Sequence, residues 1–331
     1  MPQPSTDVIA IGNAIVDVMA PCPDDLIERL GMTRGGMTLV DTARARELYD
    51  AMGPAREISG GAAANTLAGL AALGAKCTFI GQVADDQLGE VFGHDIRAGG
   101  IAFSTPVRAG DPPTARCLIF VTPDGQRTMN TFLGASQFLP AKALDADAIA
   151  DAAVLFLEGY LWDPEEPRAA MRKAIAAAKN AGRKVAFTLS DAFVIERHGA
   201  DFHAMIDTGE IDILFANEAE LAAMAGTGDF EAGLAALSAR VPVLVVTRSE
   251  KGAVAVRNGE RADVPAEPVK AVVDTTGAGD SFAAGFLYGH VRGKSLAECL
   301  KLGAICACEI IGHFGARPEA DLKALVAEKM G

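Results

Sequence analysis

The chain has 331 residues, of which 50% are hydrophobic and 22% are charged, and its formal net charge is −13. This composition supplies enough apolar side chains for a large buried core, while the acidic balance argues against nucleic acid as a partner because such proteins usually carry a basic face. The sequence contains neither an apolar run long enough to cross a membrane nor a signal-peptide pattern at its start, so we expect no membrane partner and a cytoplasmic location.

Apolar runs typical of strands alternate with helical patterns along most of the chain. Strands are expected at 8–11, 77–82, 117–122, 154–157, 184–189, 211–215, 243–247 and 253–256, and helices at 63–73, 88–98, 165–181, 219–225 and 230–239. Several strands, such as the one at 243–247, are apolar throughout, which is typical of a parallel sheet covered on both faces. The predicted fold class is therefore α/β, a doubly wound and mostly parallel sheet with helices on both faces.

Two stretches, at about 15–40 and 103–133, interrupt this alternation. They contain short strand-like pieces separated by turn residues, such as Pro123-Asp124-Gly125, and neither starts a clear strand–helix–strand unit. We expect both to form a small β-sheet, or lid, beside the main sheet, within a single domain that spans residues 1–331. The alternative is that they are ordinary edge strands of the main sheet.

The segment at 272–287 carries the most informative chemical pattern. An apolar stretch ends in Asp-Thr-Thr, Gly277 and Gly279 follow, and a long helical pattern then begins. The N–H groups of residues 277–280 would be unpaired donors at a helix start, where the helix dipole favours an anion such as a transferring phosphoryl group. Asp280 lies in the first helical turn, where its carboxylate could accept the proton of an attacking hydroxyl or, as the alternative, only cap the helix.

The same residues resemble a known family. DTTGAGDSFAAGF at 274–286 resembles the C-terminal signature of the ribokinase-like (PfkB) carbohydrate and nucleoside kinases, and GGAAAN at 60–65 resembles the N-terminal signature. The similarity runs from GNAIVD at 12–17 to FGAR at 314–317. It implies a kinase that uses ATP and Mg²⁺, with Asp280 as the base, an anion hole at Gly277, Ala278 and Gly279, and Arg127 reaching from the lid toward the transferred phosphate.

The resemblance also implies a role for further residues. Those expected to bind the acceptor are Asn13, Asp17, Gly60, Gly61 and Asn65. Those expected to contact the nucleotide are Asn217, Thr247, Gly252 and Thr275. Glu220, at the end of an NxxE motif, is expected to bind Mg²⁺ through water, since carboxylate oxygens suit this ion; helix-start charge is the alternative. The resemblance also allows for a monovalent cation, K⁺, near Asp274.

The acceptor is predicted from segments that look most like adenosine kinases, among them RTMNTFLGA at 127–135 and LEGYLWD at 157–163. By this resemblance a nucleobase would lie near Met129, Thr131, Tyr160 and Leu161, with Met37 or Leu39 covering it, although these side chains could instead be core. DTTGAGD is commoner among sugar kinases, so a sugar acceptor is the alternative. A non-catalytic nucleoside or nucleotide sensor is the alternative from another class. The oligomeric state is left open between monomer and homodimer.

Overall fold

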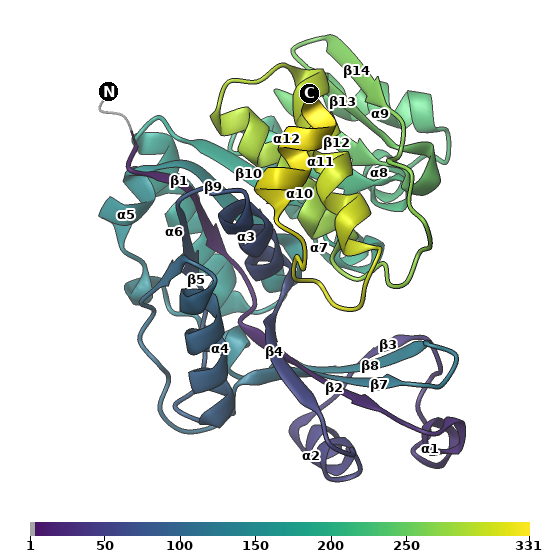
Figure 1. Cartoon of the computed structure of the whole chain (residues 1–331). Coiled ribbons are helices and arrows are strands. Elements are labelled where there is room, and N and C mark those ends of the chain that lie inside the picture. The colour runs from purple at the N-terminus through teal and green to yellow at the C-terminus, as the bar shows by residue number, and fades with distance from the viewer. Residues whose placement is uncertain (1–3) are drawn as a thin grey trace.

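A nine-stranded sheet forms the centre of the computed structural model, which describes residues 4–331 (Figure 1). The strands lie in the order β14 (Glu260–Val264), β13 (Ala253–Arg257), β12 (Val243–Thr247), β11 (Ile213–Asn217), β10 (Lys184–Thr188), β9 (Ala152–Glu158), β1 (Thr6–Ile11), β5 (Cys77–Ile80) and β6 (Ile101–Phe103). Neighbouring strands from β12 to β6 pair in parallel, whereas β13 is antiparallel to both of its neighbours. The predicted mostly parallel α/β sheet is confirmed.

Both faces of this sheet are buried because helices cover each of them. Val8 and Ala10 of β1 belong to one apolar cluster and Ile9 and Ile11 to the other, as the alternation of side chains along a strand requires. The first cluster includes residues of α3 (Ala62–Ala72), α4 (Gln87–Ala98), α10 (Ala278–Val291) and α11 (Leu296–Ile310). The second includes residues of α5 (Ala146–Ala150), α6 (Glu165–Asn180), α7 (Ala192–Asp207), α8 (Glu218–Ala225) and α9 (Phe230–Ser238).

Outside these two layers, α12 (Leu322–Met330) packs against α11 and α3. Four short 3₁₀ turns complete the connections, namely Gly134–Phe138, Ala141–Ala143, Gly159–Trp162 and Ser249–Lys251. Within residues 4–331, every helix is too short or too polar to cross a membrane.

A second, five-stranded sheet lies beside the main one (Figure 1). Its order is β3 (Met37–Leu39), β8 (Arg127–Phe132), β7 (Ala115–Val121), β2 (Ile15–Pro21) and β4 (Arg56–Gly60), and two helices, α1 (Asp24–Arg29) and α2 (Thr42–Asp50), accompany it. Both expected excursions contribute to this sheet. The strand at 56–60 was not predicted, and the strand that ends at residue 103 belongs to the main sheet.

The strand register gives the small sheet two different faces. Asp17 of β2 lies opposite Cys117 of β7, which lies opposite Thr131 of β8, which in turn lies opposite Leu39 of β3. In an adjacent row on the same face, Met129 lies opposite Met37. We call this the inner face, because Arg127, two residues from Met129 on the same strand, contacts the main body through it.

Candidate active site

The start of α10 is arranged as a donor-rich helix N-terminus. Gly277 is the N-cap residue with φ of 75°, a left-handed conformation that glycine adopts without strain, and Ala278 begins the helix. Within residues 4–331, no acceptor is found for the backbone N–H groups of Gly279 and Asp280. Cβ atoms at Gly279 would meet nothing within 4 Å, so the backbone here is open to a ligand. This arrangement supports an anion site at residues 277–280.

Asp280 is paired with Asn65, although the two are far apart in the sequence. Asn65, near the start of α3, donates its side-chain amide to Asp280 Oδ2 at 3.1 Å. Burial raises the pKa of Asp280 to about 7, opposed by the Asn65 hydrogen bond and reinforced by the negative charge of Glu158. A carboxyl group with this pKa exchanges its proton near neutral pH, which suits general base catalysis.

Two adjoining clefts meet at the start of α10. The outer cleft, of about 460 Å³, is lined by the loop at 266–275, by α11 and by a set of residues that includes Thr247, Gly252 and Thr275. The inner cleft, of about 260 Å³, contains Asp280 and is lined by residues that include Tyr160, Asn217, Glu220 and Gly277. The clefts share Thr247, Thr275, Ala278, Gly279 and Phe282. A long ligand could therefore extend from the outer cleft to Asp280.

Glu220 and Asn217 form a capping box at the start of α8. The Asn217 side chain accepts from the Glu220 N–H at 2.8 Å, and the Glu220 carboxylate accepts from the Asn217 backbone at 3.1 Å and side chain at 2.7 Å. Burial raises the pKa of Glu220 to about 7, and nearby Asp191 and Asp280 raise it further. Glu220 is thus a charged residue of a helix start, which is the alternative considered from the sequence.

This donor set also fits a divalent cation held through water. Within residues 4–331, no group of three His, Cys, Asp or Glu side chains is gathered tightly enough to bind a metal ion directly. Glu220 lines the inner cleft, and the negative charges of Asp191 and Asp280, which help to raise the Glu220 pKa, would be offset by a cation there. Water-mediated binding of this kind is typical of Mg²⁺.

Asn13 is held by other protein groups. Its backbone and side-chain N–H groups donate to Glu158 Oε1 at 2.8 and 2.6 Å, and its side-chain Oδ1 accepts from the Ser136 hydroxyl at 2.8 Å. Glu158 Oε2 accepts from the Ala63 N–H at 2.8 Å, and burial raises the Glu158 pKa. Asn13 therefore connects the end of β1 to the start of α3, rather than presenting a free amide to a ligand.

Gly60 and Gly61 make room for the chain itself. A Cβ atom at Gly60 would lie 2.6 Å from Asp17 Oδ2, and one at Gly61, where φ is 96°, would lie 2.2 Å from the Asn13 carbonyl oxygen. The glycines therefore allow a close approach of protein groups, whereas the sequence suggested approach of a ligand. Burial raises the pKa of Asp17 to about 6, and Arg317 and Arg127 oppose this shift.

Arg127 joins the small sheet to the main body. Its guanidinium lies 2.7 Å from Asp274 Oδ2, and the two side chains are only 7% and 6% exposed. Asp274 also accepts from the N–H and hydroxyl of Thr276 and from the Gly315 N–H. Next to Asp274, where the resemblance allows for K⁺, the positive charge is therefore that of the Arg127 guanidinium. Arg127 does not line either cleft in this structure.

The four residues expected around a nucleobase separate into three groups. Met129 and Thr131 lie partly exposed on the inner face, near the exposed side chains of Met37 and Leu39. Tyr160 lines the inner cleft, and burial raises its pKa. Leu161 is fully buried in the second apolar cluster, so its side chain is core and the expectation that it lies near a base is corrected.

Two residues of the site were missed in the sequence. Glu158 and Arg317 lie within segments that resemble the family, but no pattern in the sequence gives either of them a role. Arg317 donates to the Ser59 carbonyl at 2.9 Å, the Ser59 hydroxyl at 3.1 Å and the Ala64 carbonyl at 2.7 Å. No short-range pattern links residue 317 to residues 59–64, so only the fold could reveal this contact.

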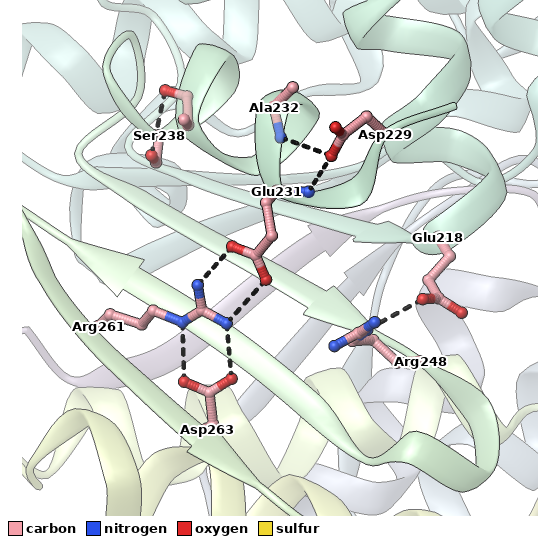
Figure 2. A network of polar contacts seen from close by, with 9 residues as sticks. Glu218, Asp229, Glu231, Ala232, Ser238, Arg248, Arg261 and Asp263 are labelled. Carbon is pink, nitrogen blue, oxygen red and sulfur yellow. Dashed lines mark hydrogen bonds and ion pairs between the residues drawn. The ribbon is translucent and has the colours of Figure 1, made fainter. Parts of the chain in front are cut away.

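An ion-pair network fixes the strands beside the outer cleft (Figure 2). Arg261 of β14 lies between Glu231 of α9 and Asp263, at 2.6 and 2.8 Å. Arg248, directly after Thr247, contacts Glu218 at 2.9 Å. Its guanidinium also lies over the Phe230 ring. The loop that follows β12 is thereby held to the starts of α8 and α9, which positions Thr247 at the cleft wall.

Comparisons with known proteins agree with this architecture. Residues 40–322 match the family described as pfkB family carbohydrate kinase. A fructokinase from Klebsiella pneumoniae is 31% identical over 246 residues, covering 73% of this chain and 80% of that protein.

Two solved structures are similar over nearly the whole chain. A probable sugar kinase from Rhizobium etli CFN 42 has a TM-score of 0.93 at 44% identity and covers 99% of both chains. An adenosine kinase from Sinorhizobium meliloti has a TM-score of 0.91 at 48% identity, covering 98% of this chain and 99% of that chain.

Proposed function

We propose that this chain, which belongs to the pfkB family of carbohydrate kinases, phosphorylates the 5′-hydroxyl of a nucleoside, with adenosine as the expected acceptor. The family makes it a phosphotransferase with an alcohol group as acceptor. The nucleoside is favoured by the 48% identity to an adenosine kinase and by the character of the inner face.

One observation carries the proposal of hydroxyl phosphorylation. The Asn65 side chain donates to Asp280, yet its own amide oxygen Oδ1 is buried and has no hydrogen-bond partner among residues 4–331. A buried polar atom without a partner is costly unless a ligand satisfies it. A substrate hydroxyl at this point could donate to Asn65 Oδ1 or to the Asp280 carboxylate, and it would then lie beside the proposed base.

The inner face favours a base-bearing acceptor. Asp17 has a carboxylate suited to the vicinal hydroxyls of a ribose, since a carboxylate accepts two hydrogen bonds at once. Farther across the same face lie Met129, Met37 and Leu39, the last two being 40% and 51% exposed. Exposed apolar side chains next to a polar group suit a flat base joined to a sugar.

In the proposed reaction, ATP lies in the outer cleft with its phosphates directed to the start of α10. The N–H groups of Gly279 and Asp280 stabilise the charge on the transferring phosphoryl group, and Asp280 accepts the proton of the attacking hydroxyl. Glu220 and Asn217 would hold Mg²⁺ through water, and this ion would offset the phosphate charge. Arg127 would assist only if its contact with Asp274 opened.

A sugar kinase is the second candidate. Thr276 favours it, and so do the fructokinase and the probable sugar kinase among the similar proteins. A non-catalytic sensor is disfavoured because Asp280 and the open backbone at Gly279 are both present.

The test is acceptor-dependent ADP release from Mg·ATP with adenosine, inosine, guanosine, cytidine, ribose, fructose and fructose 6-phosphate. Turnover with adenosine at the lowest KM supports the proposal. Turnover with sugars alone would reject the nucleoside and establish the second candidate. ATP binding without any turnover would favour the sensor.

A further inference from the structure

The segment at 314–317 touches four separate parts of the site with four successive residues. Phe314 lies under the Arg127 guanidinium at 5.2 Å, and the Gly315 N–H donates to Asp274 at 2.9 Å. A Cβ atom at Gly277 would lie 2.6 Å from Ala316 Cβ, so Ala316 packs directly on the N-cap of α10. Arg317 then reaches the turn between β4 and α3.

The Arg317 guanidinium donates both to backbone carbonyl oxygens and to a side-chain hydroxyl at this junction. Its three hydrogen bonds hold Ser59, immediately before Gly60, and Ala64, immediately before Asn65. On its other side the Ser59 N–H donates to Asp95 at 3.0 Å. The planar, five-donor guanidinium is suited to such a fork, whereas a lysine ammonium would satisfy fewer acceptors.

The charge of Arg317 is not neutralised at short range. The hydrogen bonds that its guanidinium donates go to carbonyl and hydroxyl oxygens and not to a carboxylate, and burial lowers its pKa to about 10. The carboxylates that favour its charged form from farther away are Asp17, Asp95 and Asp280. A cation kept without a direct ion pair costs stability, so its placement facing two carboxylates of the site calls for a reason.

We propose that Arg317 is a positioning residue for phosphoryl transfer: it holds the end of β4 against the start of α3, which carries Asn65, and it supplies the positive charge that Asp17 and Asp280 share. This proposal rests on the proposed function, because it concerns the acceptor side of the same site. Through Asn65 it sets the orientation of Asp280. Through its charge it favours the ionised, proton-accepting form of that carboxylate.

A test must separate the effect of the Arg317 charge on Asp17 and Asp280 from the effects of the other charged and titratable groups around them. Around Asp280 the charged and titratable groups are Glu158, Arg317, Asp17, Glu220 and Tyr160. Around Asp17 they are Arg317, Arg127 and Asp274. Arg317 is the cation that both sets share, so neutralising it should raise the pKa of both carboxyl groups, whereas a general loss of packing would not act on these two alone.

The experiment compares Arg317→Gln, which removes the charge, with Arg317→Lys, which keeps the charge but loses the fork. Arg240→Gln is the matched control, since this arginine also makes several polar contacts but lies outside both clefts and outside the network beside Thr247. For each protein we would measure kcat/KM for the acceptor against pH, the Kd of ATP, and the Tm. ¹³C NMR of aspartate-labelled protein, assigned with Asp17→Asn and Asp280→Asn, would follow the two carboxyl groups without relying on turnover.

We expect Arg317→Gln to lose about 10²-fold in kcat/KM, the usual cost of misplacing a reacting group, while ATP binding is kept. Its acidic limb and both carboxyl titrations should move to higher pH. Arg317→Lys should lose activity with little change in either titration, and Arg240→Gln should match the wild type. Normal kcat/KM in Arg317→Gln, or unmoved carboxyl titrations, would overturn the proposal.

Failure of the proposed function would look different. If the wild type phosphorylates only a sugar, the nucleoside is rejected and the Arg317 variants are assayed with that sugar. If no acceptor is phosphorylated, the ¹³C titrations decide alone whether Arg317 acts on the two carboxyl groups.

Discussion

The donor side and the acceptor side of the site are built in different ways. On the donor side, the open N–H groups and the base lie within residues 277–280, and the clefts around them are lined by the ends of neighbouring strands. On the acceptor side, Asp17, Asn65, Met129 and Arg317 come from β2, α3, β8 and the segment before α12. Local geometry fixes the donor side, whereas long-range contacts assemble the acceptor side.

The largest loss of activity is expected at Asp280, where the donor side and the acceptor side meet. Asp280→Asn should reduce kcat on the order of 10²–10⁴-fold, the usual contribution of a general base, while ATP and the acceptor still bind. ADP release and calorimetry would measure these quantities. Asn65 keeps a partner in this variant, which limits structural change. A kcat within about tenfold of the wild type would remove Asp280 as the base.

The pH dependence provides a second measure of the same group. With a pKa of about 7, Asp280 is mostly protonated below neutral pH and cannot accept a proton there. The wild-type rate should therefore rise as pH increases through about 7, and this limb should vanish in Asp280→Asn. A rate that is flat from pH 6 to 8, about one unit on either side of that pKa, would contradict the assignment.

Glu158→Gln should affect the acceptor side of the site and leave the donor side unchanged. Glu158 accepts three hydrogen bonds from Asn13 and Ala63, so a neutral amide that also carries two donors would fit poorly. We expect unfolding to cost about 1–3 kcal/mol less and the KM for the acceptor to rise, with the KM for ATP unchanged. Denaturant unfolding and kinetics would show this, with the exposed Glu260→Gln as control. An equal rise in both KM values would mean that the two sides are not separable.

Met129→Ala tests the inner face alone. Removing an apolar contact to a base should raise the KM for adenosine about tenfold, within the range for a few missing methylene groups, and leave any turnover of ribose unchanged. The comparison of both acceptors in one variant is the measurement. The exposed Val107→Ala, outside the small sheet, is the control. If adenosine kinetics are unaffected, the base does not lie on this face.

The smallest effect concerns stability. Because burial holds the Asp17 pKa near 6, above its ordinary value, ionising this carboxyl in the folded protein costs free energy at pH 8. Below about pH 4 the carboxyl is protonated in both folded and unfolded chains, and the cost disappears. Asp17→Asn should therefore raise the Tm by a few degrees at pH 8 and have no effect near pH 4. A lower Tm at pH 8 would show that Asp17 stabilises the fold.

This contrast also explains what could be read from the sequence. The apolar strands and the 277–280 motif were predicted because neighbours along the chain determine them, and the structure has both. The strand at 56–60, which is largely polar, was not predicted, and the sequence left open whether Leu161 is core, since both depend on what packs against them. Arg317 was missed because its partners lie more than 250 residues away.

The contacts of residues 314–317 also constrain how related chains can diverge. Each of the four residues meets a different partner, and successive Cα atoms are about 3.8 Å apart. One inserted or deleted residue would shift the later contacts by roughly that distance, which exceeds the tolerance of a hydrogen bond. Relatives that keep this site should therefore keep the number of residues in this segment unchanged.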